Sequence, residues 1–144
     1  MSESEPAPAD RLSGSPPAPP GFVLMTPPGV FLNRTALFYG RTEDDGATTV
    51  GTWITPAQAN SEMVAHGGFL LTFADFALSY VLDGITLNLS ADFLRPARVG
   101  EWMEARIGSR RRSRSLIFAD GVATVRNKDV LRFSGLFRPV ERTT

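Results

Sequence analysis

The chain has 144 residues, 42% of them hydrophobic, with fifteen basic and fifteen acidic residues. This length supports one domain with a real core, and a formal net charge of zero excludes a global field that would attract nucleic acid or an anionic membrane. The absence of cysteine excludes disulfides, thiolate nucleophiles and thiolate metal sites.

The N-terminal segment, residues 1–28, is dominated by proline, alanine and serine and is predicted to be a disordered tail. It starts with acidic residues and lacks the basic and then apolar order of a signal peptide, so we expect a cytoplasmic protein. Residues 22–25 are apolar and are expected to dock on the domain as a short helix or turn. The folded domain is predicted to span residues 29–144.

The domain is expected to begin with two strands, residues 36–39 and 48–54, joined by a hairpin turn at Asp45-Gly46. A loop containing Asn60 follows, and then a long apolar run over residues 69–82. This run is too long for a strand and is apolar around almost its whole circumference, so it predicts one central helix buried on nearly all sides. Its length and its carboxylate at Asp75 argue against a membrane span.

Beyond the helix the pattern is that of strands. Residues 87, 89, 91 and 93 are apolar and alternate with polar residues, which predicts a half-buried strand. Three further strands are expected at 101–110, 114–126 and 130–139, separated by an arginine corner at 110–112 and a turn at 127–129. Because the helix has no other apolar partner, the strands must wrap it. The predicted fold class is α+β, a curved antiparallel sheet around one long central helix.

Asp75 is the most informative residue, because an ionised carboxylate in the middle of an apolar helix is costly unless it is paired or hydrogen-bonded. It is either a structural residue bonded to nearby backbone or hydroxyl groups, or a base or nucleophile in a semi-buried site.

The motif His66-Gly67-Gly68 stands where the helix begins. Its backbone N–H groups lie at a positive helix end, which binds oxyanions; alternatively, the glycines only permit a tight turn and close packing. His66 is the only histidine, which excludes a metal site of several histidines, and we interpret it as a structural or substrate-shaping residue rather than a general base. Asn60 and Thr86 are ambiguous by themselves.

The spacing inside the helix predicts a dimer. Gly67 and Asp75 are eight residues apart in the sequence, which is about 12 Å along a helix axis. They cannot flank one carbonyl carbon, so joint action requires two subunits with antiparallel helices across a two-fold axis. We therefore expect a homodimer, or a dimer of two such dimers.

Taken together, Asn60, His66-Gly67-Gly68, Asp75 and the run Asp92-Phe93-Leu94-Arg95-Pro96-Ala97-Arg98-Val99-Gly100 resemble the PaaI-type branch of the hotdog-fold acyl-CoA thioesterases. The likeness spans residues 35–139. In that family roughly six residues lie between the Asn and the His-Gly-Gly motif, and six lie between that motif and the Asp. Here five residues lie between Asn60 and His66, and six lie between Gly68 and Asp75. The resemblance implies a hotdog fold and hydrolysis of acyl-CoA thioesters to free acid and coenzyme A, without a metal or organic cofactor.

The resemblance also implies a role for each motif residue. The Gly67 N–H polarises the thioester carbonyl, Asn60 orients it or the attacking water, and Asp75 of the partner subunit acts as general base or nucleophile. Thr86 matches a family Ser or Thr that hydrogen-bonds the water or the carboxylate, although the connection from Asp75 is shorter here than in some relatives. His66 and Gly68 are expected to contact the substrate.

Four arginines, Arg110, Arg111, Arg112 and Arg114, form the densest positive patch. Coenzyme A phosphates favour guanidinium groups, so Arg111, Arg112 and Arg114 are interpreted as a nucleotide anchor, a role that Arg95 or Arg98 could share. The alternative is a solvated strand corner. Nucleic acid is a less favoured ligand for this patch, because no aromatic residues interleave with these arginines.

Two other functions stay open. One is a non-catalytic acyl-CoA-binding hotdog module, which only an activity measurement distinguishes. The other is an acyl-thioester hydratase or dehydratase, which would need a histidine and an acid placed for proton transfer at carbon. Several aromatic residues predict either an apolar acyl pocket or simple core, so the acyl group is not identified: Phe69, Phe73, Phe76, Tyr80 and Phe93.

Overall fold

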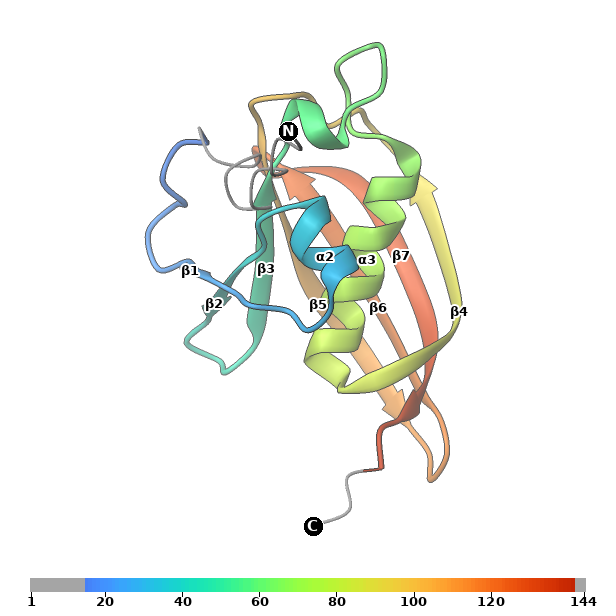
Figure 1. Ribbon diagram of the computed structural model, residues 1–144. Coiled ribbons are helices and arrows are strands. Elements are labelled where there is room, and N and C mark those ends of the chain that lie inside the picture. The colour runs from blue at the N-terminus through green and yellow to red at the C-terminus, as the bar shows by residue number, and fades with distance from the viewer. Residues whose placement is uncertain (1–14, 142–144) are drawn as a thin grey trace, which may run out of the picture.

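One antiparallel sheet and one long helix make up most of the molecule. The computed structural model describes residues 15–141. In chain order the elements are β1 (Val23–Leu24), α2 (Val30–Thr35), β2 (Tyr39–Thr42), β3 (Thr48–Trp53), the 3-10 turn η1 (Pro56–Gln58), α3 (Gly67–Leu82), β4 (Gly84–Phe93), β5 (Trp102–Arg112), β6 (Ile117–Val125) and β7 (Lys128–Pro139). The strand order is β1-β2-β3-β5-β6-β7-β4 (Figure 1). The predicted series of two strands, one helix and four strands is confirmed, with β1, α2 and η1 in addition.

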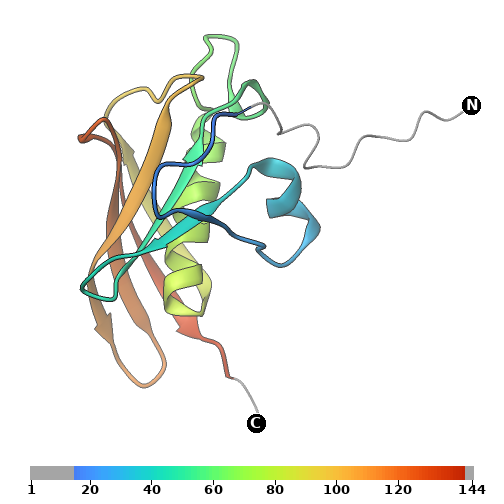
Figure 2. The same cartoon turned by 90° about the vertical axis from the view of Figure 1, so that its left-hand side faces the viewer.

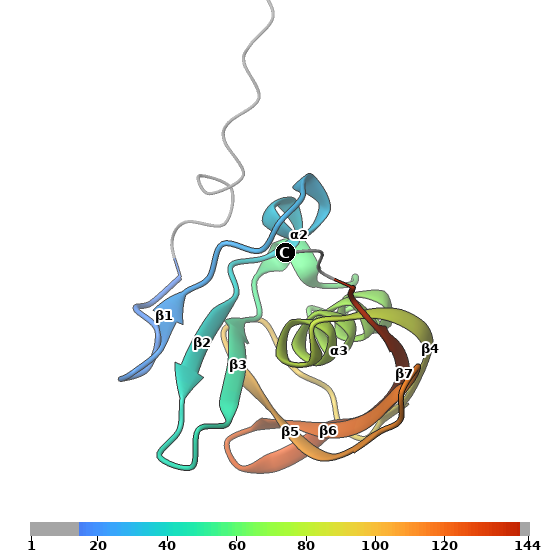
Figure 3. The same ribbon diagram turned by 90° about the horizontal axis from the view of Figure 1, so that it is seen from below.

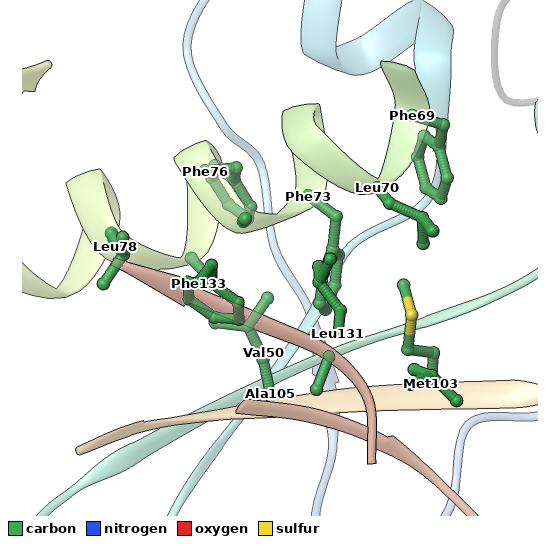
Figure 4. Close-up of a cluster of buried hydrophobic side chains, with 14 of the residues drawn as sticks. Val50, Phe69, Leu70, Phe73, Phe76, Leu78, Met103, Ala105, Leu131 and Phe133 are labelled. Carbon is green, nitrogen blue, oxygen red and sulfur yellow. The ribbon is translucent and has the colours of Figure 1, made fainter. Parts of the chain in front are cut away.

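The sheet curves around α3, which lies in its concave face (Figure 3). Apolar side chains of α3 point toward the strands, where Phe73 lies beside Leu131 (Figure 4), and Leu78 belongs to the same buried cluster. These three side chains are completely removed from solvent. The predicted α+β architecture is confirmed, and its cause is the one given by the sequence: an apolar helix of 16 residues has to be covered by the strands that follow it.

One face of α3 is open, so the prediction that the helix is buried on nearly all sides is corrected. Along this face Gly68 is exposed, and Thr72, Asp75 and Ser79 are half-buried. The hydroxyls of Thr72 and Ser79 donate to the carbonyls of Gly68 and Asp75 at 3.0 and 2.7 Å, so the helix itself satisfies them. Leu71 and Tyr80 of the same helix are also exposed, at 37% and 53%, so the open part of α3 is not purely polar. No helix within residues 15–141 is long and apolar enough to cross a membrane.

The first hairpin has the predicted turn but a shifted first strand. Gly46 has a φ of 83°, and the Ala47 N–H donates to Asp45 Oδ1 at 3.0 Å. The ladder begins at Tyr39 rather than at residue 36. The carbonyl of Phe38 instead accepts from the Met25 N–H at 2.8 Å, within the N-terminal segment.

Two later turns also lie beside their predicted positions. The arginine corner expected at 110–112 belongs to β5, because Arg112 still pairs with Ile117. The connection follows at residues 113–116, where the Ser113 N–H donates to the Leu116 carbonyl at 2.8 Å. The turn expected at 127–129 consists of Arg126 and Asn127, whose φ angles of 52° and 64° are typical of a two-residue hairpin turn.

Part of the segment predicted to be a tail packs on the sheet. Residues 1–14 lie outside the described residues. Residues 22–25 dock as expected, but β1 forms a strand paired with β2 rather than a helix or turn. The Phe22 ring lies edge-on to Trp102 at 4.9 Å, and the Arg41 guanidinium lies 4.4 Å from the Phe22 ring centroid. Aromatic contact therefore orders a stretch whose proline content suggested disorder.

Strand β4 departs from the predicted alternation at Leu87. The register with β7 shifts between Thr86 and Asn88, so Leu87 is an extra residue that changes which side chains face inward. Leu89 packs against the core as predicted, but Leu87 is 50% exposed. The same bulge lets Thr86 face α3. Because β4 is the last strand in the sheet order, its outer edge has no partner strand within residues 15–141.

Candidate functional site

Residues 66–68 form the turn at the start of α3 and are called here the glycine turn. This turn presents one free backbone donor. His66 is the N-cap residue, and its Nδ1 accepts from the Gly68 N–H at 2.9 Å. The Gly67 N–H has no acceptor within residues 15–141. It points from the positive end of a long helix, so the turn offers a donor for a partly negative oxygen.

The space over Gly67 is open, which bears on the alternative that the glycines serve only close packing. A Cβ placed on Gly67 would meet nothing nearer than the Phe93 ring at 3.7 Å, an ordinary contact. A Cβ on Gly68 would lie 3.2 Å from His66 Nδ1, which is tight. Close packing therefore explains Gly68 but not Gly67.

Asp75 lies half-buried at the middle of the open face of α3. It is the only charged residue of the helix. The Thr86 hydroxyl on β4 donates a hydrogen bond to Asp75 Oδ1, while Oδ2 has no hydrogen-bond partner within residues 15–141. The bond from Thr86 fixes the carboxylate and leaves one oxygen free to accept a proton or to attack an electrophile.

A single subunit does not bring Gly67 and Asp75 together. Their separation of eight residues inside α3 corresponds to about 12 Å along the axis. The two residues do lie on an accessible part of the same helix, so a second copy in antiparallel orientation would place each opposite the other.

Asn60 lies in the loop that leads to the glycine turn. Its Oδ1 accepts from the Glu62 N–H at 2.9 Å, and a bridge between Ala59 and Ala65 closes the loop at its base. The Nδ2 group of Asn60 has no acceptor within residues 15–141. Asn60 therefore shapes the loop through its oxygen and keeps its amide donor available.

The predicted nucleotide anchor lies at the other end of the subunit. Arg111 and Arg112 are on the last residues of β5 and Arg114 is in the following turn, all exposed. This turn is at the end of the molecule where α3 finishes (Figure 1). The structure therefore does not bring these arginines to the glycine turn of the same subunit. Arg98 lies closer to it, since residue 98 bridges to Val64.

A cleft of about 460 Å³ lies beside the glycine turn, and α2 forms one of its walls. Figure 2 shows α2 on the side of α3 that faces away from the sheet. The cleft is lined by residues of α2 (Phe31, Arg34, Thr35), of η1 and the residue after it (Ala57, Gln58, Ala59) and of the start of α3 (His66, Gly68, Phe69, Thr72). No group of three or more His, Cys, Asp or Glu residues able to hold a metal occurs within residues 15–141.

Gln58 joins α2 to the glycine turn, a role that its place in the sequence did not predict. Its Nε2 donates to the Thr35 carbonyl at 2.8 Å, its Oε1 accepts from the Thr55 N–H at 2.8 Å, and its own carbonyl accepts from the His66 N–H at 2.8 Å. The readable signal was the capping box from Thr55 to Gln58, with Pro56 at the first helical position.

Replacing Gln58 by leucine is expected to destabilise the protein, because Gln58 is only 4% exposed. The substitution would leave the Thr35 carbonyl and the Thr55 N–H without partners, which costs about 1–3 kcal/mol for each group. Urea unfolding of Gln58→Leu beside the unmodified protein measures this difference. An unchanged free energy of unfolding would show that water or a local shift replaces these hydrogen bonds.

Sequence comparisons relate the chain to known thioesterases and esterases. The family model described as Thioesterase superfamily matches residues 63–130. The Pseudomonas aeruginosa protein named "Putative esterase PA0474" is 28% identical over 127 residues, covering 83% of this chain and 95% of that protein.

Solved structures show the same fold. A variant of the phenylacetic acid degradation protein PaaI from Thermus thermophilus aligns with a TM-score of 0.69 at 23% identity, over 76% of this chain and 98% of that chain. A hypothetical thioesterase protein from Streptococcus pneumoniae, solved with coenzyme A, aligns with a TM-score of 0.68 at 19% identity, over 74% and 91% of the two chains. The predicted hotdog fold is confirmed.

Proposed function

We propose that the chain hydrolyses acyl-CoA thioesters to a free acid and coenzyme A, because its residues 63–130 match the Thioesterase superfamily model and it has the hotdog fold. The observation that carries this proposal is the free Gly67 N–H at the start of α3, on the helix that also bears the hydrogen-bonded carboxylate of Asp75. The Streptococcus pneumoniae protein of the same fold was solved with coenzyme A, which supports this class of substrate.

The proposed reaction uses the Gly67 N–H and the Asp75 carboxylate. The thioester carbonyl oxygen accepts from the Gly67 N–H, and a water molecule attacks the carbonyl carbon while Asp75 of the second subunit takes one of its protons. The oxygen becomes an oxyanion held by the Gly67 N–H, an interaction worth about 3–4 kcal/mol in the transition state. The carbon–sulfur bond then breaks, and the thiolate of coenzyme A receives the proton from Asp75. In the alternative route the Asp75 carboxylate attacks the carbonyl carbon itself and expels the thiolate of coenzyme A, which takes a proton from solvent. Water then hydrolyses the resulting mixed anhydride, which releases the free acid and regenerates the carboxylate.

Thr86 and Asn60 position these reacting groups. The hydrogen bond from the Thr86 hydroxyl holds one carboxylate oxygen, so the other faces the water. The Asn60 amide donor, in the loop next to the glycine turn, orients the thioester carbonyl or the water.

A homodimer with antiparallel α3 helices completes the site. Strand β4 has an unpaired outer edge within residues 15–141 and exposed apolar side chains, among them Ile85 (45%) and Leu87 (50%). Such an edge is usually protected by another strand or by a second chain. An antiparallel second copy also brings its own β5–β6 turn to the end of the molecule where Gly67 lies. Arg111, Arg112 and Arg114 of that copy then anchor the phosphates of coenzyme A, and two dimers can assemble further into a dimer of dimers.

Release of free thiol from a panel of aryl-acyl and alkyl-acyl-CoA substrates tests this proposal. We expect turnover of at least one substrate, with coenzyme A and the free acid as the only products. If acyl-CoA binds but none is hydrolysed, the chain is a binding module. If an enoyl-CoA is hydrated at carbon instead, the hydratase function is correct; the use of His66 Nδ1 as a helix cap argues against that outcome.

A further inference from the structure

The cleft beside the glycine turn has a wall that the family match does not include. Helix α2, residues Val30–Thr35, precedes residues 63–130, which match the thioesterase model. The cleft has a volume of about 460 Å³, which lies in the range of about 300–1,000 Å³ typical of small-molecule sites. The cleft is lined by His66 and Gly68, the two sequence neighbours of Gly67, so a substrate whose carbonyl reaches Gly67 lies close to this wall.

Arg34 gives this cleft a positive charge. It is the only Asp, Glu, Lys or Arg residue among those that line the cleft. Its side chain forms no hydrogen bond or ion pair with any residue in 15–141. Some arginines outside the cleft do have partners: Arg95 donates to the Asp129 carbonyl at 2.9 Å, and Arg106 lies 3.9 Å from Asp45. A guanidinium without a partner, close to the positive end of α3, favours a negatively charged group in the cleft.

The backbone of α2 is held in place with respect to the glycine turn. Gln58 donates to the carbonyl of Thr35, at the last residue of α2, and accepts from the N–H of His66. Asn33 of α2 reaches back to the segment before the helix, where its Nδ2 donates to the carbonyls of Pro27 and Gly29 at 2.8 and 2.7 Å. Only the side chain of Arg34 has to become ordered when an anion binds, which lowers the entropic cost of binding.

The exposed ring of Phe31 adds an apolar surface to the same wall. It is 68% exposed and lies one helical turn before Arg34, so the two side chains fall on the same side of α2. A ligand with an anionic group next to an apolar or planar part fits both.

We propose that Arg34 is a substrate-binding residue that recognises an anionic group of the thioester, either a phosphate of coenzyme A or a carboxylate at the far end of the acyl group. The inference rests on the proposed function, since it deepens the description of the same site. It adds to the predicted anchor at Arg111, Arg112 and Arg114, which lies at the opposite end of the subunit (Figure 1).

The test compares Arg34→Gln with Arg106→Gln, which removes the same charge at an ion-paired position of β5. Binding of coenzyme A is measured by calorimetry, and KM and kcat are measured on three kinds of thioester. These are an acyl-CoA with a neutral acyl group, the same acyl group on pantetheine, which carries no nucleotide phosphates, and an acyl-CoA whose acyl group ends in a carboxylate.

If Arg34 binds a phosphate, Arg34→Gln raises KM for every acyl-CoA by about tenfold and weakens binding of coenzyme A to the same extent, as expected for a lost charged hydrogen bond. The pantetheine thioester is then unaffected. If Arg34 binds an acyl carboxylate, only the carboxylate-bearing substrate loses affinity. The inference is overturned if Arg34→Gln and Arg106→Gln agree within twofold in all these measurements. Calorimetry with coenzyme A needs no turnover, so a protein that binds it through Arg34 without hydrolysing any thioester would refute the proposed function alone.

Discussion

Gly67→Pro lowers kcat for thioester hydrolysis by about 10²- to 10³-fold, the expected effect of removing one oxyanion donor. Proline has no backbone N–H, and it is well tolerated at the first position of a helix, which is where Gly67 lies. The preceding residue His66 has a φ of −62° and a ψ of 139°, a conformation that a following proline favours. The substitution therefore removes the proposed donor while α3 stays intact.

Gly67→Ala is the matched control, because it adds a methyl group and keeps the N–H. The added carbon would lie 3.7 Å from the Phe93 ring, so kcat is expected to stay within about tenfold of the unmodified enzyme. Thiol release gives kcat, and thermal unfolding verifies that both variants are folded. A Gly67→Pro enzyme that is folded and as active as Gly67→Ala would remove the Gly67 N–H from the mechanism.

Asp75→Asn is expected to lower kcat by about a hundredfold or more, the usual contribution of a general base. Asparagine has nearly the same size as aspartate and can still accept the hydrogen bond from Thr86, but it can neither take a proton from water nor attack the carbonyl carbon. The fold and the dimer should therefore be preserved while the chemical step is lost.

The measurement compares thiol release by Asp75→Asn and by the unmodified enzyme at equal dimer content, determined by size-exclusion chromatography with light scattering. Asp44→Asn, an exposed carboxylate in the turn between β2 and β3, serves as a control and should leave kcat unchanged. If Asp75→Asn keeps full activity, Asp75 is a structural residue that Thr86 satisfies.

Mixing the two inactive variants shows whether the site combines two subunits. When Gly67→Pro and Asp75→Asn subunits exchange, half of the dimers are mixed, and each mixed dimer has one intact pair of Gly67 and Asp75. Activity should return to about one quarter of the unmodified level after refolding together. A mixture that stays inactive despite subunit exchange would place both residues in the site of a single subunit.

The sequence determined the elements whose cause is local. The apolar run that became α3, the turn signal at Asp45-Gly46 and the series of strands after Gly84 were all predicted, because hydrophobic period and turn chemistry depend on residues close together in the chain. The motif from Asn60 to Asp75 was readable for the same reason. The distance of about 12 Å between Gly67 and Asp75 along the helix axis follows from helix geometry alone.

Only the tertiary structure decided the features that depend on contacts between distant segments. The prolines before residue 28 suggested a tail, yet Phe22 docks against Trp102. The bulge at Leu87 turned Thr86 toward Asp75, which no alternation pattern could show. Arg34 entered the cleft because Gln58 ties α2 to the glycine turn across 23 residues of sequence. Such hydrogen bonds and ring contacts form between residues that become neighbours only when the chain folds, so the local sequence carries no periodic signal for them.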